Sequence, residues 1–205
     1  MEAKTKKSEL TRNAIIDAGI DIALNQGLGA VTVPGLAEKL QLSTSGVFSR
    51  IGSIEALRAA IVGEYGRRFL AEVFFPALKK PKGLARLNAM VEVWLHKICT
   101  DSSSKLTLFE VTAFSMDQAA HDTRDMVKSN VRAWRDVMMR TVTQAIEQKE
   151  LVDGVDPELL LFGIHSLMLG ALYEFRVMND PDAATKAWAS YLALMALFNR
   201  PLGSA

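Results

Sequence analysis

The sequence predicts an all-α protein, and three of its features lead to this prediction. Apolar residues recur at the three- and four-residue spacing of α-helices through most of the 205 residues. No segment alternates convincingly between apolar and polar residues, as a half-buried β-strand does. Residues that cap helices, such as Ser, Thr and Asp, precede several periodic segments, and Gly or Pro follows them.

Three short helices are expected first. The first covers residues 11–26, where apolar side chains line two neighbouring faces and a glycine follows. Thr32 offers a capping oxygen to a second helix, which runs to about residue 40. Ser43 or Thr44 can cap the third. The second and third helices are therefore separated only by a short turn.

A long fourth helix is expected to connect this region to the rest of the chain. Ser53 can cap it, and it runs from residue 54 toward residue 75, where Pro76 closes it. Residues 77–83, ALKKPKG, have the composition of a linker. Beyond the linker, further helices are expected at 84–100, 105–118, 123–150, 157–178 and 182–199.

The second and third helices can share a small core. Its apolar residues recur at helical spacing and are Leu36, Ala37, Leu40, Val47, Phe48 and Ile51. Ala37 is small enough for the two helices to cross closely. This pairing predicts a helix-turn-helix, although ordinary helical hairpins produce a similar pattern.

The polar residues left over would form the outer surface of that motif. They lie at the start and outer side of the third helix and are Thr44, Ser45, Gly46, Ser49 and Arg50. Hydroxyl groups and free backbone N–H groups at a helix start can bond phosphate, and short side chains let the helix approach the bases. A helix-turn-helix offers this surface to the major groove of DNA.

Residues 14–57, AIIDAGIDIALNQGLGAVTVPGLAEKLQLSTSGVFSRIGSIEAL, resemble the N-terminal domain of the tetracycline-repressor (TetR) family of transcriptional regulators. The shared features are a helix that ends at Gly, the VTV segment with Thr32, the LAEKL helix, a short recognition helix and the EAL start of the fourth helix. The resemblance implies a DNA-binding domain over 1–53 and an effector-binding and dimerisation domain over 54–205. It also implies a cytoplasmic homodimer that binds double-stranded operator DNA, usually as a repressor.

The resemblance also places the DNA contacts. They are expected at Lys6, Lys7, Thr32, Thr44, Ser45, Gly46, Phe48, Ser49 and Arg50. A flexible basic arm that includes Lys4 would add backbone or minor-groove contacts, unless it is only a solvated tail.

Four residues depart from the family pattern. Gln41 stands where a turn glycine is usual, and a positive φ there would cost on the order of 1 kcal/mol. Phe48 keeps the ring of the usual Tyr but lacks its hydroxyl group, and Arg50 replaces a His. Ile54 stands where the family often has a phosphate-binding Lys. Arg50 is expected to recover one phosphate contact, and the rest of the affinity is expected to depend on Lys4, Lys6 and Lys7.

The late segment ELVDGVDPELLLFGIHSLMLGAL resembles the start of the family's dimer-forming helices. Independently, its helix is apolar on nearly every side, so both sides need to be covered. Two stripes at helical spacing give the expected four-helix interface between two copies: Gly163, Leu167, Gly170, Glu174, Trp188, Tyr191, Leu192 and Met195. A single monomeric core is the alternative.

An effector cavity is implied by the family, surrounded by the C-terminal helices. Residues that would line it are Trp94, Phe109, Phe114, Met116, Trp134, Met138, His165 and Met168. Methionine and aromatic side chains suit a flat or apolar ligand, although each of them also fits an ordinary core. In the expected mechanism, this ligand moves the long fourth helix and so changes the separation of the two recognition helices on a near-palindromic operator.

Other classes of function find little support. The formal charge of +1 gives no general attraction to polyanions, and the lone Cys99 excludes an internal disulfide framework. The longest apolar run, 159–173, falls short of a membrane span. We find no phosphate-binding loop, nucleophile motif or helical metal-ligand spacing, so no enzyme, metal or cofactor is expected. A helical interaction module that does not bind DNA remains the alternative.

Overall fold

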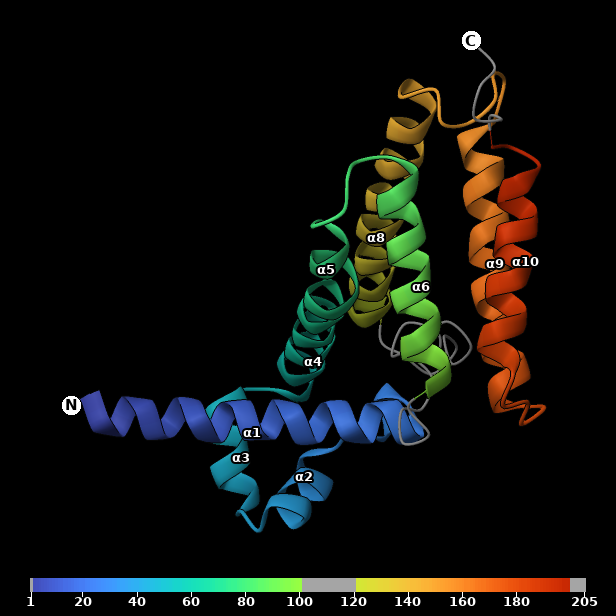
Figure 1. Ribbon diagram of the computed structural model, residues 1–205. Helices are drawn as coiled ribbons and strands as arrows, with labels where there is room; N and C mark the ends of the chain where they lie inside the picture. Colours follow the sequence, from blue (N-terminus) through green and yellow to red (C-terminus); the bar gives the residue numbers. More distant parts are fainter. Residues whose placement is uncertain (1, 101–120, 200–205) are drawn as a thin grey trace. The chain divides into compact units, whose positions relative to one another are not determined.

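A computed structural model describes residues 2–100 and 121–199, and these are helical apart from connecting turns and one isolated bridge between Leu151 and Asn199 (Figure 1). The described residues within 1–68 and 104–131 form one compact unit. Those within 69–103 and 132–205 form a second. The all-α prediction is confirmed.

The first unit contains the expected short helices. Its elements are α1 (Glu2–Gln26), a 3-10 turn (Leu28–Ala30), α2 (Val33–Leu40), α3 (Thr44–Ile51) and most of α4 (Ile54–Phe69). The predicted bounds of α2 and the predicted start of α3 are confirmed. The first helix begins about nine residues before the predicted start, at Glu2. The prediction that Lys4, Lys6 and Lys7 form a flexible arm is wrong, because these residues belong to α1. Their side chains lie outside what the structure describes, so the predicted DNA contacts of Lys6 and Lys7 stay a prediction.

Side-chain caps explain where the short helices begin. The backbone N–H of Gly35 donates to Thr32 Oγ1 over 3.2 Å, and that of Gly46 donates to Ser43 Oγ over 3.0 Å. Ser43 is thus the cap of α3. Between the two helices Gln41 has φ 54°, the left-handed conformation expected where the family places glycine. The strain predicted from the sequence is present.

The helix α4 packs closely on the helices before it. A side chain at Gly19 of α1 would collide with Ile61, so this glycine permits the approach of α1 and α4. Arg58 Nη2 donates to the backbone oxygens of Gly29 at 3.2 Å and Val31 at 3.3 Å. These contacts fix α4 against the turn that leads into α2.

After Phe69 the long helix changes its winding. A π-helical segment (Leu70–Phe74) and a short helix α5 (Phe75–Ala77) continue it. The single helix predicted over 54–75 is therefore interrupted, and Pro76 does not close it. Proline is tolerated there because it occupies the first turn of α5, where its missing N–H would have no partner.

The second unit is built from α6 (Leu84–Thr100), most of α8 (His121–Glu147), α9 (Pro157–Arg176) and α10 (Ala183–Ala196). The predicted helix at 105–118 lies outside the described residues. Asp156 caps α9, because its Oδ1 accepts from the backbone N–H groups of Glu158 at 2.9 Å and Leu159 at 3.2 Å. Cys99 is buried, and burial raises the pKa of its thiol to about 11, as expected for an unreactive core cysteine.

By length and composition alone, α9 could cross a membrane. Its 20 residues exceed the run of 159–173 considered from the sequence. In the fold, however, α9 packs against α6 and α10, and its residues Ile164 and Met168 are completely buried. The helix therefore has the character of a core helix that also carries an open apolar face.

Candidate functional site

The outer side of α3 is open to solvent. Thr44, Ser45 and Ser49 are exposed, and the ring of Phe48 is 55% exposed. We call these four residues the recognition strip. Phe48 thus lies outside the small core to which the sequence assigned it, because the neighbouring Val47 alone turns fully inward.

Polar groups are concentrated at the start of this helix. Ser43 Oγ lies 3.2 Å from Ser45 Oγ and also accepts from Gly46 N, so the cap occupies one of the free amides. The first two amides of an α-helix have no acceptor within the helix and point outward. The helix start therefore combines N–H donors, two exposed hydroxyl groups and a favourable dipole end for an anion such as phosphate.

Arg50 is folded back along its own helix. Its Nη1 donates to the backbone oxygen of Gly46 over 2.6 Å and lies 3.4 Å from Ser49 Oγ. Its Nε is buried and has no acceptor in the part of the chain that the structure describes. A phosphate contact by Arg50 would therefore require this side chain to leave the Gly46 carbonyl. Thr32 is exposed, and its hydroxyl oxygen already caps α2.

An aromatic cluster occupies the second unit. Trp94 of α6 and Trp134 of α8 meet edge to face with centroids 5.3 Å apart, and Phe69 lies 5.1 Å from Trp134. His165 of α9 lies 5.6 Å from Trp94. Met138 and Met168 are fully buried in the same unit. Phe109, Phe114 and Met116 lie outside the described residues, so the structure brings together only part of the expected pocket.

Two polar groups of this cluster have no hydrogen-bond partner in the described part of the chain. The indole N–H groups of Trp94 and Trp134 are buried and have no acceptor within residues 2–100 and 121–199. Leaving such a donor unpaired costs about 1–3 kcal/mol. Burial, assisted by the charge of Arg135, lowers the pKa of His165, so its imidazole is neutral at physiological pH. Sequence reasoning missed Phe69, which its position at the end of α4 did not mark as part of this cluster.

Some of the α9 and α10 residues that were expected to bind a second copy are exposed to solvent. Gly170 and Glu174 are exposed, Leu192 is 46% exposed, and Leu167 and Trp188 are half-buried. A side chain at Gly170 would meet no atom within 4 Å. These residues remain candidates for the interface.

Two residues assigned to that interface instead belong to the subunit's own core, and a third, Gly163, is half-buried next to α10. Tyr191 and Met195 are 0% and 1% exposed, and the Tyr191 hydroxyl donates to Asn88 Oδ1 over 2.6 Å. A side chain at Gly163 would approach Leu194 of α10 to 3.3 Å, so this glycine serves packing within the subunit. Helical spacing alone could not tell which stripe faced inward.

Large apolar residues that the interface prediction omitted lie on the open face of α9. Leu159, Phe162 and Tyr173 are 66%, 63% and 54% exposed. Their spacing of three, then eleven residues keeps them near one side of the helix together with Gly170. The sequence could have indicated this face. A helix that is apolar on all sides needs only one side for its own core, so the other side is available for a partner.

Comparison with known proteins places the fold. Residues 83–191, more than half of the chain, match the family model for the C-terminal domain of tetracyclin repressor-like proteins. Among curated proteins, none matches the chain significantly.

Solved structures agree over nearly the whole chain. A TetR regulator from Chloroflexus aurantiacus superposes with a TM-score of 0.81 at 16% identity, covering 95% of this chain and 100% of that one. A TetR-family regulator from Cytophaga hutchinsonii gives 0.78 at 18% identity, covering 94% and 96%. AibR, solved with isovaleryl coenzyme A and operator DNA, gives 0.70 at 16% identity, covering 89% and 96%. This protein therefore belongs to the tetracycline-repressor (TetR) family of transcriptional regulators, which are DNA-binding proteins and not enzymes.

Proposed function

We propose that the protein is a cytoplasmic, ligand-responsive repressor that leaves its operator when a small apolar or aromatic molecule binds. The observation that carries the DNA-binding part is the recognition strip, which presents Thr44, Ser45 and Ser49 to solvent at the start of α3. Had these residues been packed inside the unit, no duplex could reach them. The strip carries three hydroxyl groups and no basic residue, so its contacts are mainly neutral hydrogen bonds to phosphate and bases.

A dimer would provide a second recognition helix for the second half-site of the operator. Two copies related by a twofold axis would join their α9 and α10 faces, where Leu159, Phe162 and Tyr173 are exposed. Covering such residues is favourable, at roughly 25 cal/mol per Å² of apolar surface removed from water. Each recognition helix then reads one half of a near-palindromic site, with half-sites one helical turn or more apart.

The dimer face is tested by Phe162→Glu. Since the twofold axis repeats every residue, this change buries two unpaired carboxylates and raises the dimer dissociation constant by about 100-fold or more. Thr143→Glu, at an exposed site on α8, is the matched control and leaves the dimer intact. Sedimentation equilibrium measures both. An unaltered dimer in the Phe162 variant places the interface elsewhere.

The effector part is supported by the aromatic cluster. Its rings offer flat apolar contact area, and the unpaired indole N–H groups of Trp94 and Trp134 can donate to a ligand. AibR is a structural relative whose complex holds both a small molecule and operator DNA. A ligand acts only as far as it binds the DNA-free state more tightly than the bound one.

Operator binding is tested by gel shift with the DNA that flanks the protein's own gene. We expect sequence-selective binding that weakens as salt increases. Thr44→Ala should weaken it about fivefold to tenfold through one lost hydrogen bond, whereas Thr143→Ala on α8 should have no effect. Binding that is absent, or the same for any sequence, favours a helical interaction module without specific DNA recognition.

The effector is found by a thermal-shift screen of apolar and aromatic compounds, because a ligand of the folded state raises Tm. A true effector must also release the operator in the gel shift. A compound that raises Tm and leaves DNA binding unchanged is a ligand but not an inducer.

A further inference from the structure

A cleft lies between α1 and α4 within the first unit, and the function proposed above assigns it no role. Its volume is about 490 Å³, within the range of small-molecule sites. The lining residues come from one face of each helix and are Arg12, Asn13, Ile16, Asp17, Ala60, Glu64, Arg67 and Arg68. Their spacing of three and four residues explains why they converge.

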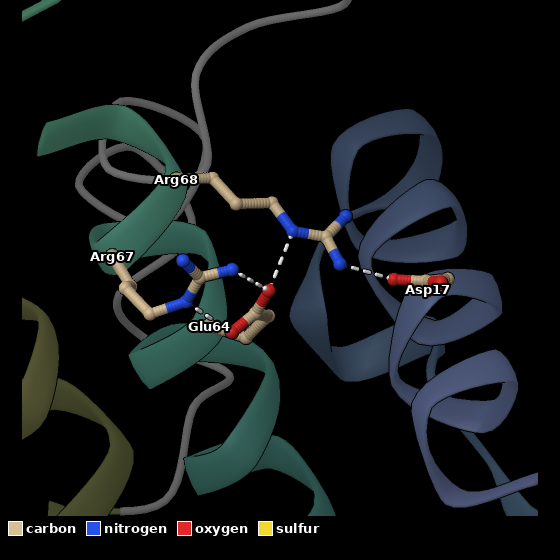
Figure 2. A network of polar contacts seen from close by, with 4 residues as sticks. All are labelled: Asp17, Glu64, Arg67 and Arg68. Carbon is tan, nitrogen blue, oxygen red and sulfur yellow. Dashed lines mark hydrogen bonds and ion pairs between the residues drawn. The ribbon is translucent and has the colours of Figure 1, made fainter. Parts of the chain in front are cut away.

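The acidic groups of this cleft are already neutralised. Glu64 accepts from Arg67 through two bonds, Nε at 2.8 Å and Nη2 at 2.7 Å, and from Arg68 Nε at 2.7 Å (Figure 2). Arg68 also pairs with Asp17 across the two helices. Both arginines lower the pKa of Glu64, to about 2, so its carboxylate stays charged at any physiological pH. Neither carboxylate is therefore left to attract a cation.

The positive charges of the cleft, by contrast, are not all neutralised. Three arginines face two carboxylates in the cleft, which leaves an excess of one positive charge. Arg12 is exposed, and among the described residues no hydrogen bond or ion pair involves it. Arg67 engages Glu64 through Nε and Nη2 and retains further N–H donors, because a guanidinium group carries five.

We propose that this cleft binds a small oxyanion, a carboxylate or a phosphate group of a metabolite, between Arg12 and Arg67. Guanidinium groups hold such anions by paired N–H···O bonds, and Asn13 can donate a further one. Arg67 keeps Glu64 and uses its remaining donors. The site is distinct from the aromatic cluster, and the anion would tie α1 to α4 in addition to the Arg68 bridge.

The test uses the full-length protein and inorganic phosphate, with NaCl adjusted so that ionic strength stays constant. Saturable shifts of the α1 and α4 amide signals in NMR, with a millimolar Kd, are expected for the wild type. Arg12→Gln should weaken binding at least tenfold. Arg140→Gln, which removes an exposed arginine of α8, is the matched control and should bind as the wild type does. Equal binding by both variants, or none by the wild type, overturns the proposal.

DNA phosphate is the competing partner for Arg12. Operator affinity of Arg12→Gln, measured over a range of salt concentrations, should equal that of the wild type. A loss of affinity with a salt slope reduced by about one unit would assign Arg12 to the DNA interface and overturn the proposal. The oxyanion proposal and the operator proposal can be disproved independently. Phosphate binding that depends on Arg12 would support the first even if the protein bound no operator.

Discussion

The recognition strip and the aromatic cluster are built in opposite ways. The strip lies on α3, whose eight residues are placed by a serine cap and one left-handed turn residue, Gln41. The aromatic cluster joins Phe69, Trp94, Trp134 and His165 from four helices far apart in sequence. Local chemistry positions the first, whereas only packing positions the second. Substitutions should therefore affect affinity in the strip and stability in the cluster.

The largest effect is expected for Trp134→Ala. Trp134 is 4% exposed and contacts both Phe69 and Trp94, so its loss should lower the free energy of unfolding by about 3–5 kcal/mol. Urea denaturation measures this. Trp134→Phe keeps most of the contact area and removes the unpaired N–H, so it should cost less than about 1.5 kcal/mol. Equal losses of unfolding free energy in the two variants would show that packing of an aromatic ring at this position does not stabilise the fold.

Smaller effects on stability are expected at the start of α3, where they should differ between the capping residue Ser43 and the recognition-strip residue Thr44. Ser43→Ala removes the bond to Gly46 N and should cost about 1 kcal/mol of stability. Thr44→Ala, one residue later and exposed, should cost less than about 0.5 kcal/mol while still weakening the operator complex. Thermal unfolding of both variants provides the comparison. If Thr44→Ala proved the more destabilising, the strip would be part of the fold and not a free surface.

The turn before α3 offers a gain in stability. Gln41→Gly should stabilise the protein by about 0.5–1 kcal/mol, because glycine adopts φ 54° without the Cβ clash. The same change at Glu38, an exposed residue with ordinary helical geometry in α2, should destabilise by a similar amount. Denaturant midpoints for the pair test the sign. A loss in both variants would show that the Gln41 side chain makes contacts worth more than the strain.

The smallest effect concerns Glu64 and depends on pH. Its pKa in the folded protein lies near 2, below the ordinary 4.5, so its contribution to stability is complete above pH 4.5 and disappears as the pH falls toward 2. The side chains of Arg67 and Arg68 are 68% and 39% exposed, so solvent screens both pairs and the contribution is at most about 1 kcal/mol. Glu64→Gln should therefore be slightly less stable at pH 7 and equal to the wild type near pH 2. Thermal unfolding across this range is the measurement, and a constant difference would contradict it.

Much of the first unit was accessible from the sequence. Thr32, Ser43 and Ser53 marked helix starts correctly, because a cap is a bond between residues three apart and needs no partner from elsewhere. The positive φ of Gln41 was considered only because the family resemblance places a turn glycine at that position. The exposure of Thr44, Ser45 and Ser49 was likewise predicted, since these short polar residues flank an apolar stripe, whereas Phe48 was wrongly assigned to the core.

Only the tertiary structure decided which face of each long helix turned inward. Tyr191 and Met195 share the apolar character of Leu192, yet the first two lie in the core and the last is exposed. The α1–α4 cleft and the place of Phe69 in the aromatic cluster were equally hidden from the sequence. Helical periodicity determines which residues lie on the same side of a helix. Whether that side faces the core, solvent or another subunit depends on contacts between residues distant in the chain.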